Sequence, residues 1–130
     1  MNLFDDMNLE YLTKALDASV MRNNVIANNI ANVNTPNYIA QGVNFEEMMK
    51  ECIAKEKDGF QQASFGKSEN MILNNLASVQ PTVYSTGNKV NINTEMAEMA
   101  KNQIWYNAIV SQGIGKMFSR LNSVLSMFQG

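Results

Sequence analysis

Apolar residues in the first third of the chain recur at spacings of three and four, which is the spacing of one face of an α-helix. The pattern predicts a helix over residues 6–33. Its seam consists of Leu9, Leu12, Leu16, Ser19, Asn23, Ile26, Ile30 and Val33. The seam is heptad-like, and two polar residues interrupt it in the middle.

The last third of the chain carries a second seam of the same kind, which predicts a helix over residues 94–128. Thr94 suits the N-cap position, and Glu95 and Glu98 suit the positive end of the helix dipole. The seam consists of Ala97, Ala100, Ile104, Asn107, Ser111, Ile114, Phe118, Leu121, Leu125 and Phe128. Gly113 and Gly115 each cost about 1 kcal/mol relative to alanine, so we expect a bend or a close helix contact there.

The polar interruptions predict how the two helices pair. If Asn23 lies opposite Asn107 in an antiparallel pair, Ser19 lies opposite Ser111 and the apolar positions on both sides also match. Polar pairs within a seam lower stability but fix its register. We therefore predict a mainly α-helical fold in which the terminal helices form an antiparallel, coiled-coil-like hairpin.

Smaller elements are predicted between the helices. Residues 44–57 form an amphipathic helix that opens with a capping-box-like Asn44 and Glu47 and ends at Gly59. Its apolar face consists of Phe45, Met48, Met49, Cys52 and Ile53. A loop and a small β-hairpin are expected over residues 58–93. The loop is irregular over residues 60–75 with a helical turn at 71–76, and the hairpin strands are residues 82–84 and 90–92.

The whole chain of 130 residues fits one domain. Its apolar seams are long, while the core that they would enclose is thin. Because most helix stability comes from packing an apolar face, we expect other subunits to complete the burial.

One stretch at the end of the first helix has an unusual composition, with five asparagines and no charge. It consists of Ala27, Asn28, Asn29, Ile30, Ala31, Asn32, Val33, Asn34, Thr35, Pro36, Asn37 and Tyr38. An exposed helix end normally carries charges, so this stretch, which we call the turn motif, is predicted to contact another protein. A purely local alternative is a helix with an asparagine-rich cap and a turn.

The second half of the turn motif has a local structural reason. Asn32 or Asn34 can adopt the left-handed conformation that ends a helix. Pro36 and Asn37 suit the centre of a type II turn, in which the second residue needs a positive φ. Tyr38 can pack its ring back while its hydroxyl stays in water.

Composition argues against several function classes. The net charge of −2 does not suit a nucleic-acid-binding protein, which needs a basic surface. The chain has no histidine, and Cys52 has no nearby base, so we expect no catalytic, metal or cofactor site. Residues 1–10 lack the pattern of a cleavable secretory signal, and no apolar run is long enough to span a membrane.

The turn motif closely resembles the A-N-N-I-A-N-x-N/D-T-P-G-Y signature of flagellar rod and hook proteins, with Asn37 in place of the usual glycine. Asparagine tolerates a positive φ, so the difference is mild. Residues 87–95 resemble the G-N-x-V-x-x-x-x-E stretch that opens the C-terminal helix of a proximal-rod protein. The short length also resembles the proximal-rod members, and a FlgC-like protein is an alternative.

The resemblance implies a structural subunit of the proximal rod in the flagellar basal body. Such a subunit self-assembles through its terminal helices and helps to transmit torque. It would be exported by the flagellar type III apparatus without a cleaved signal, into the periplasm and cell-wall zone. Its implied partners are other rod proteins, a FliE-type adaptor, the MS-ring protein and the export apparatus, with no nucleic acid or small-molecule ligand.

Two alternatives come from the residues alone. A cytoplasmic coiled-coil adaptor or chaperone explains the two seams but not Asn34-Thr35-Pro36-Asn37-Tyr38. Binding of the last helix to a membrane surface is a further alternative, because Lys116 and Arg120 lie beside apolar residues. Few basic residues line that helix, which favours a packed helix instead.

Overall fold

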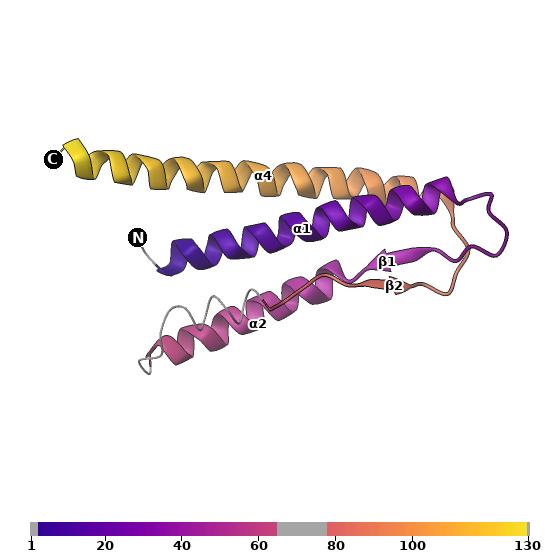
Figure 1. The fold of residues 1–130 in the computed structure, drawn as a ribbon, viewed down its shortest axis with the longest axis horizontal. Coiled ribbons are helices and arrows are strands. Elements are labelled where there is room, and N and C mark those ends of the chain that lie inside the picture. The colour runs from indigo at the N-terminus through magenta and orange to yellow at the C-terminus, as the bar shows by residue number, and fades with distance from the viewer. Residues whose placement is uncertain (1–2, 65–77, 130) are drawn as a thin grey trace.

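Two long helices, α1 and α4, lie side by side along the molecule and run in opposite directions (Figure 1). The computed structural model describes residues 3–64 and 78–129. α1 spans Leu3–Ala31 and α4 spans Ile92–Gln129. The mainly helical fold with an antiparallel pair of terminal helices is therefore confirmed.

The register of this pair differs from the predicted one. The Asn102 side-chain amide donates a hydrogen bond to the Ser19 carbonyl at 2.9 Å, so Ser19 lies opposite Asn102 and not opposite Ser111. One turn away, Arg22 pairs with Glu98. The prediction matched polar side chains with each other, but the buried amide of Asn102 bonds to backbone instead. The partner position on α4 is therefore nine residues earlier than predicted.

In the shifted register the last residues of α4 lie beyond the first described residue of α1. Continuing the register from Ser19 and Asn102 places Leu3 opposite about residue 118. Residues 119–129 therefore extend past α1 by about 16 Å at 1.5 Å per residue. Figure 1 shows this projecting end of α4 beside the N-terminal end of α1.

Among the described residues, two small apolar clusters lie on either side of α1. In one, Leu12 and Ala15 of α1 pack against Ile109 of α4. In the other, Ala18 packs with Phe45, Met48, Cys52 and Val79. The predicted apolar face of the middle helix is confirmed for Phe45, Met48 and Cys52, whereas Ile53 is exposed.

The middle helix, α2, spans Phe45–Ser64 and is longer than predicted. It continues through Gly59, because a single glycine costs only about 1 kcal/mol in a helix whose neighbours are good helix formers. Residues 60–64 are therefore helical and not part of a loop. The rest of the predicted loop and its helical turn lie outside the described residues.

The start of α2 is also held differently from the prediction. The Asn44 backbone carbonyl accepts the first helical hydrogen bond, from the Met48 N–H at 2.9 Å. Its side-chain oxygen accepts a hydrogen bond from the Thr82 N–H at 2.6 Å. Asn44 therefore joins the helix start to the segment before β2 and does not form a capping box.

A two-stranded antiparallel sheet is present, and the predicted strand 82–84 nearly coincides with β2, but its partner is β1 and not residues 90–92. β1 spans Gln41–Val43 and pairs with β2, Val83–Ser85. Gly42 lies opposite Tyr84, and a Cβ atom at Gly42 would come within 2.8 Å of the Tyr84 ring. Strand pairing between segments forty residues apart cannot be seen in a local pattern.

The predicted second strand, residues 90–92, instead leads into α4, which begins at Ile92. Asn91 caps this helix: its side-chain oxygen accepts hydrogen bonds from the N–H groups of Asn93 at 3.0 Å and Thr94 at 3.2 Å. The cap therefore lies three residues before the predicted Thr94. The helix is unbroken through Gly113, where an added Cβ would meet open space, so the expected close contact is absent there.

Candidate assembly interface

The turn motif ends α1 and reverses the chain by a tight turn. Beyond Ala31 the helix closes with a hydrogen bond from the Val33 N–H to the Ile30 carbonyl at 3.2 Å. The following turn is closed from the Tyr38 N–H to the Thr35 carbonyl at 3.3 Å. Asn37 has a φ of 63°, so the prediction of positive φ at this position is confirmed.

One asparagine of the motif, Asn29, is buried and hydrogen-bonded within the fold. Asn29 is 1% exposed, and its amide group bonds to the backbone of Gln41 in both directions. The Tyr38 hydroxyl also donates to the Asn29 oxygen, at 3.4 Å. Asn29 thus fixes the chain returning from the turn against α1. Its spacing of three from the buried Ile26 is the sequence signal for this inward position.

Asn32 has a local role. Its side-chain nitrogen donates to the Asn28 carbonyl at 2.8 Å, and its side-chain oxygen accepts the Thr35 hydroxyl at 3.0 Å. The Asn28 carbonyl also accepts the Asn32 backbone N–H at 3.1 Å, so the side-chain bonds reinforce the last turn of the helix. The local interpretation of the motif therefore accounts for Asn29 and Asn32.

Most of the remaining motif residues face outwards, whereas Ile30 and Tyr38 are half-buried. Those exposed are Ala27, Asn28, Ala31, Val33, Asn34, Thr35, Pro36 and Asn37. A shallow cavity of about 260 Å³ is formed by residues 32–38 together with Lys89 and Val90. The structure therefore offers an uncharged surface at this end of the molecule, bordered by the single charge of Lys89.

The predicted seam of α4 also faces outwards, while the matching seam of α1 faces inwards. Leu12 and Ile26 of α1 are buried, and Leu9 and Leu16 are half-buried. On α4 the exposed seam residues are Ile104, Ile114, Phe118, Leu121, Leu125 and Phe128. We call these six residues the outer face of α4. Ile104 is 71% exposed and Phe128 is 85% exposed.

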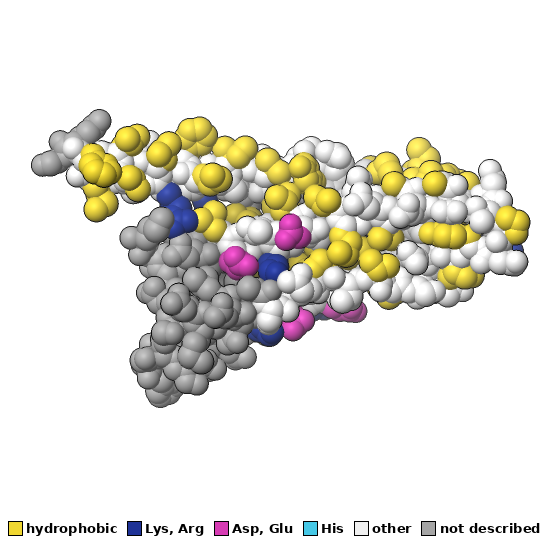
Figure 2. Space-filling view, viewed as in Figure 1, with side chains coloured by type: hydrophobic (Ala, Val, Ile, Leu, Met, Phe, Trp, Pro, Cys, Tyr) yellow, Lys and Arg dark blue, Asp and Glu magenta, His cyan; other side chains and the backbone are white. Residues whose placement is uncertain are grey.

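The reason for this exposure is the shifted register. Asn102 and Ile109 point to α1, and Ile104 lies about 200° around the helix from Asn102 at 100° per residue. Figure 2 shows hydrophobic side chains along α4 up to its end. Exposed apolar patches of this extent mark contacts with other proteins.

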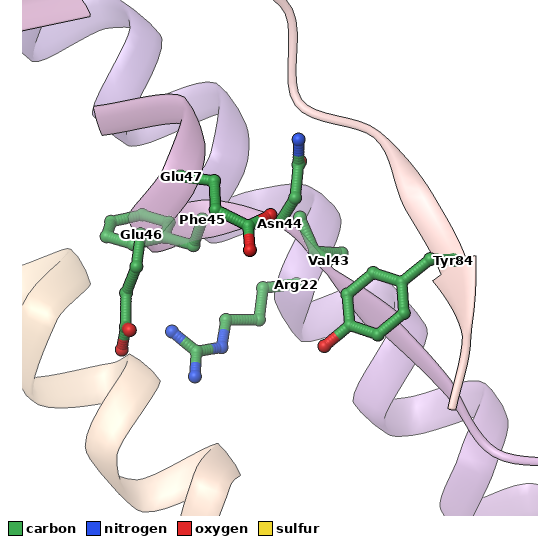
Figure 3. Close-up of a pocket in the computed structure, with 7 residues that line it drawn as sticks. All are labelled: Arg22, Val43, Asn44, Phe45, Glu46, Glu47 and Tyr84. Carbon is green, nitrogen blue, oxygen red and sulfur yellow. The ribbon is translucent and has the colours of Figure 1, made fainter. Parts of the chain in front are cut away.

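A polar contact at Arg22 of α1 joins α1, α2 and α4. The Arg22 guanidinium lies 2.6 Å from the Glu98 carboxylate, and its carbon is 5.6 Å from the centre of the Phe45 ring. Figure 3 shows Arg22 beside Glu46, Glu47 and residues of both strands, around a cavity of about 170 Å³. The arrangement fits an ionic connection between helices, because nothing in it supplies a nucleophile with a base.

The described residues contain no cluster of potential metal ligands. In the same part of the chain no helix is long and apolar enough to cross a membrane. The surfaces that stand out are therefore the turn motif and the outer face of α4.

Residues 9–38, which comprise most of α1 and the whole turn motif, match the family described as flagella basal body rod protein. Over nearly its full length the chain is similar to the flagellar basal body rod protein FlgB of Bacillus subtilis. The two are 33% identical over 129 residues, covering 97% of this chain and 98% of the relative. The chain belongs to the FlgB family of flagellar basal body rod proteins.

Other FlgB proteins agree with this assignment. FlgB of Borrelia hermsii is 32% identical over 119 residues, with 82% of this chain and 86% of the relative covered. FlgB of Escherichia coli is 24% identical over 131 residues, with 93% of this chain and 95% of the relative covered. The resemblance seen in the turn motif is confirmed, and FlgB is favoured over the FlgC-like alternative.

Membership in the FlgB family gives the chain a structural role in the rod of the flagellar basal body, together with other rod and basal-body components. The prediction of a non-enzymatic protein is confirmed by the same family.

Proposed function

We propose that the chain is a proximal-rod subunit that assembles with neighbouring axial proteins through the outer face of α4 and the turn motif. The observation that supports this proposal is the outward direction of the apolar seam of α4. A helix with an apolar face gains most of its stability by packing that face. The outer face of α4 would therefore gain this stabilisation only when the subunit binds its neighbours.

We also propose which proteins the subunit contacts and how it leaves the cytoplasm. The subunit contacts other proximal-rod proteins, a FliE-type adaptor and the MS-ring protein, and it passes through the flagellar export apparatus without a cleaved signal. In the assembled rod it transmits torque. Long antiparallel helices suit this task, because the packed interiors of proteins have low compressibility.

The outer face can be tested by changing it without changing the monomer. Leu121 and Leu125 are about half exposed, so Leu121→Gln and Leu125→Gln remove apolar contact surface and leave the described core intact. We expect the double variant to fail to restore swimming in a strain lacking the gene, and its rod to be absent in isolated basal bodies. Its unfolding free energy should change by less than about 0.5 kcal/mol for each substitution.

Asn122→Gln on the same helical turn is the matched control and should restore swimming. Normal swimming by the double variant would contradict the proposal. Export is tested separately: the chain should be absent from the periplasm when the flagellar export apparatus is inactivated, whereas export that continues would contradict the proposed route.

A further inference from the structure

A groove lies between α1, α2 and α4, in the middle of the molecule. Its volume is about 440 Å³, which is within the range of about 300–1,000 Å³ typical of cavities that enclose a ligand. Its apolar lining includes Tyr11, Leu12, Met49, Ile53, Trp105 and Ile109. Trp105 and Ile53 are nearly half exposed there, so the described chain leaves this apolar surface incompletely covered.

Positive charges border the groove. Arg22, Lys50 and Lys101 line its edge, against one carboxylate from Glu46. Arg22 is already paired with Glu98, whereas Lys50 and Lys101 are exposed. An apolar segment with a negative end therefore suits this groove better than a basic one.

The projecting end of α4 has these properties. Residues 121–129 contain no charged side chain, and Leu121, Leu125 and Phe128 are exposed. The last turn of a helix carries the negative end of the helix dipole, which basic side chains stabilise by about 0.3–1 kcal/mol. The end of α4 thus complements the groove in both hydrophobicity and charge.

The end of α4 cannot reach the groove of its own chain. Within one molecule, Leu121 follows the groove residue Gln112 by nine positions of an unbroken helix, or about 13 Å. A continuous helix cannot fold back onto its own earlier turns. We propose that the end of α4 in one copy binds in the groove of a second copy, a contact that rests on the proposed function in the rod.

The two surfaces of this contact are different parts of the chain. Such a heterologous contact repeats from copy to copy and closes into a ring only if the rotation between copies allows it. The groove would thereby give the subunit a specific acceptor for its neighbour, in addition to the general packing of apolar helices.

Photo-crosslinking tests the contact in the purified full chain. Phe128 is replaced by p-benzoylphenylalanine, and isotopically labelled and unlabelled copies are mixed over a series of increasing concentrations and irradiated. We expect crosslinks between a labelled and an unlabelled chain, attached to residues 11–15, 49–53 or 105–112. Lys101→Glu should lower their yield about 1.4- to fivefold, since an exposed charge contact is worth about 0.2–1 kcal/mol.

Lys89→Glu makes the same charge change outside the groove and should leave the yield unchanged. Crosslinks from Phe128 to residues 114–128 of the second copy would overturn the groove proposal, as would crosslinks within one chain alone or none at the highest concentration. In those cases the swimming defect of the Leu121 and Leu125 variant would still support the proposed rod function, so the two failures are distinguishable.

Discussion

Asn29 and Gln41 are joined by two hydrogen bonds. The side-chain amide of Asn29 bonds to both the N–H and the carbonyl of Gln41, as the backbone of a neighbouring strand would. The Asn29 nitrogen donates to the Gln41 carbonyl at 2.8 Å, and the Gln41 N–H donates to the Asn29 oxygen at 3.0 Å. The pair connects the end of α1 to the first residue of β1. It separates a structural asparagine from the outward-facing ones of the same motif.

Asn29→Ala should lower the unfolding free energy by about 2–4 kcal/mol. The substitution removes three hydrogen bonds of the Asn29 side chain, two with the Gln41 backbone and one with the Tyr38 hydroxyl, and each contributes about 0.5–1.5 kcal/mol. Urea unfolding followed by circular dichroism measures the change. Asn28→Ala, one position earlier and exposed, is the control and should be neutral or slightly stabilising, because alanine favours helix. Equal effects of the two substitutions would contradict the assigned role.

Asn28 provides the cleanest test of the turn motif as a contact surface. Its side chain is exposed, and a carboxylate in the last turn of α1 opposes the helix dipole, so Asn28→Asp should lower stability by only about 0.3–1 kcal/mol. A new charge on an uncharged contact should nevertheless impair swimming on soft agar. Asn32 is less suitable, since its amide also bonds within the helix end. Unchanged swimming with Asn28→Asp would remove the argument from the charge-free stretch.

The turn at Pro36 and Asn37 should tolerate glycine and reject a branched side chain. With a φ of 63°, Asn37 occupies the left-handed region, where a non-glycine residue costs about 1–2 kcal/mol. Asn37→Val should therefore lower stability by about that amount, while Asn37→Gly should stay within about 1 kcal/mol of the original chain. Thermal unfolding of both variants checks this, and a Val variant as stable as the Gly variant would argue against the turn geometry.

The ion pair of Arg22 and Glu98 should contribute modestly to stability. Their side chains are 16% and 37% exposed, so solvent screens part of the attraction. A double-mutant cycle with Arg22→Met and Glu98→Gln should give a coupling energy of about 0.5–1 kcal/mol. The coupling should decrease when the salt concentration rises to about 1 M, where charges are screened within about 3 Å. A coupling that does not change with salt would point to packing instead.

Disulfide crosslinking distinguishes the observed helix register from the one expected from the polar seam positions. Ala15 and Ile109 pack in one cluster, so cysteines at these two positions should crosslink on oxidation. Leu16 and Ile114 would face each other only if Ser19 lay opposite Ser111. Cysteines at positions 16 and 114 should therefore crosslink poorly. Both pairs are made in a Cys52→Ala background and scored on denaturing gels. A higher yield for Leu16 and Ile114 would contradict the observed pairing.

The sequence was most informative where a structure depends on neighbouring residues. The periodic seams predicted both long helices, and Pro36 with Asn37 predicted the turn and its positive φ. These features follow from local backbone preferences, which nearby residues determine.

Features that depend on distant residues were not predictable in the same way. β2 pairs with β1 although α2 lies between them in the sequence. The Asn102 side chain bonds to a backbone carbonyl of α1 and not to a polar side chain. The seam of α4 was predicted correctly as an apolar stripe, but periodicity cannot say whether such a stripe meets the same chain or another one.

The outer surface of α4 also includes methionines, and this gives the free subunit a chemical weakness. Met96, Met117 and Met127 are all well exposed. Oxidation turns a methionine side chain from apolar into polar and disrupts methionine-rich contacts. An unassembled subunit that is exposed to oxidants therefore loses apolar contact surface with time. Burial of these methionines against a neighbouring subunit would protect their sulfur atoms. Prompt incorporation would preserve the subunit chemically as well as place it mechanically.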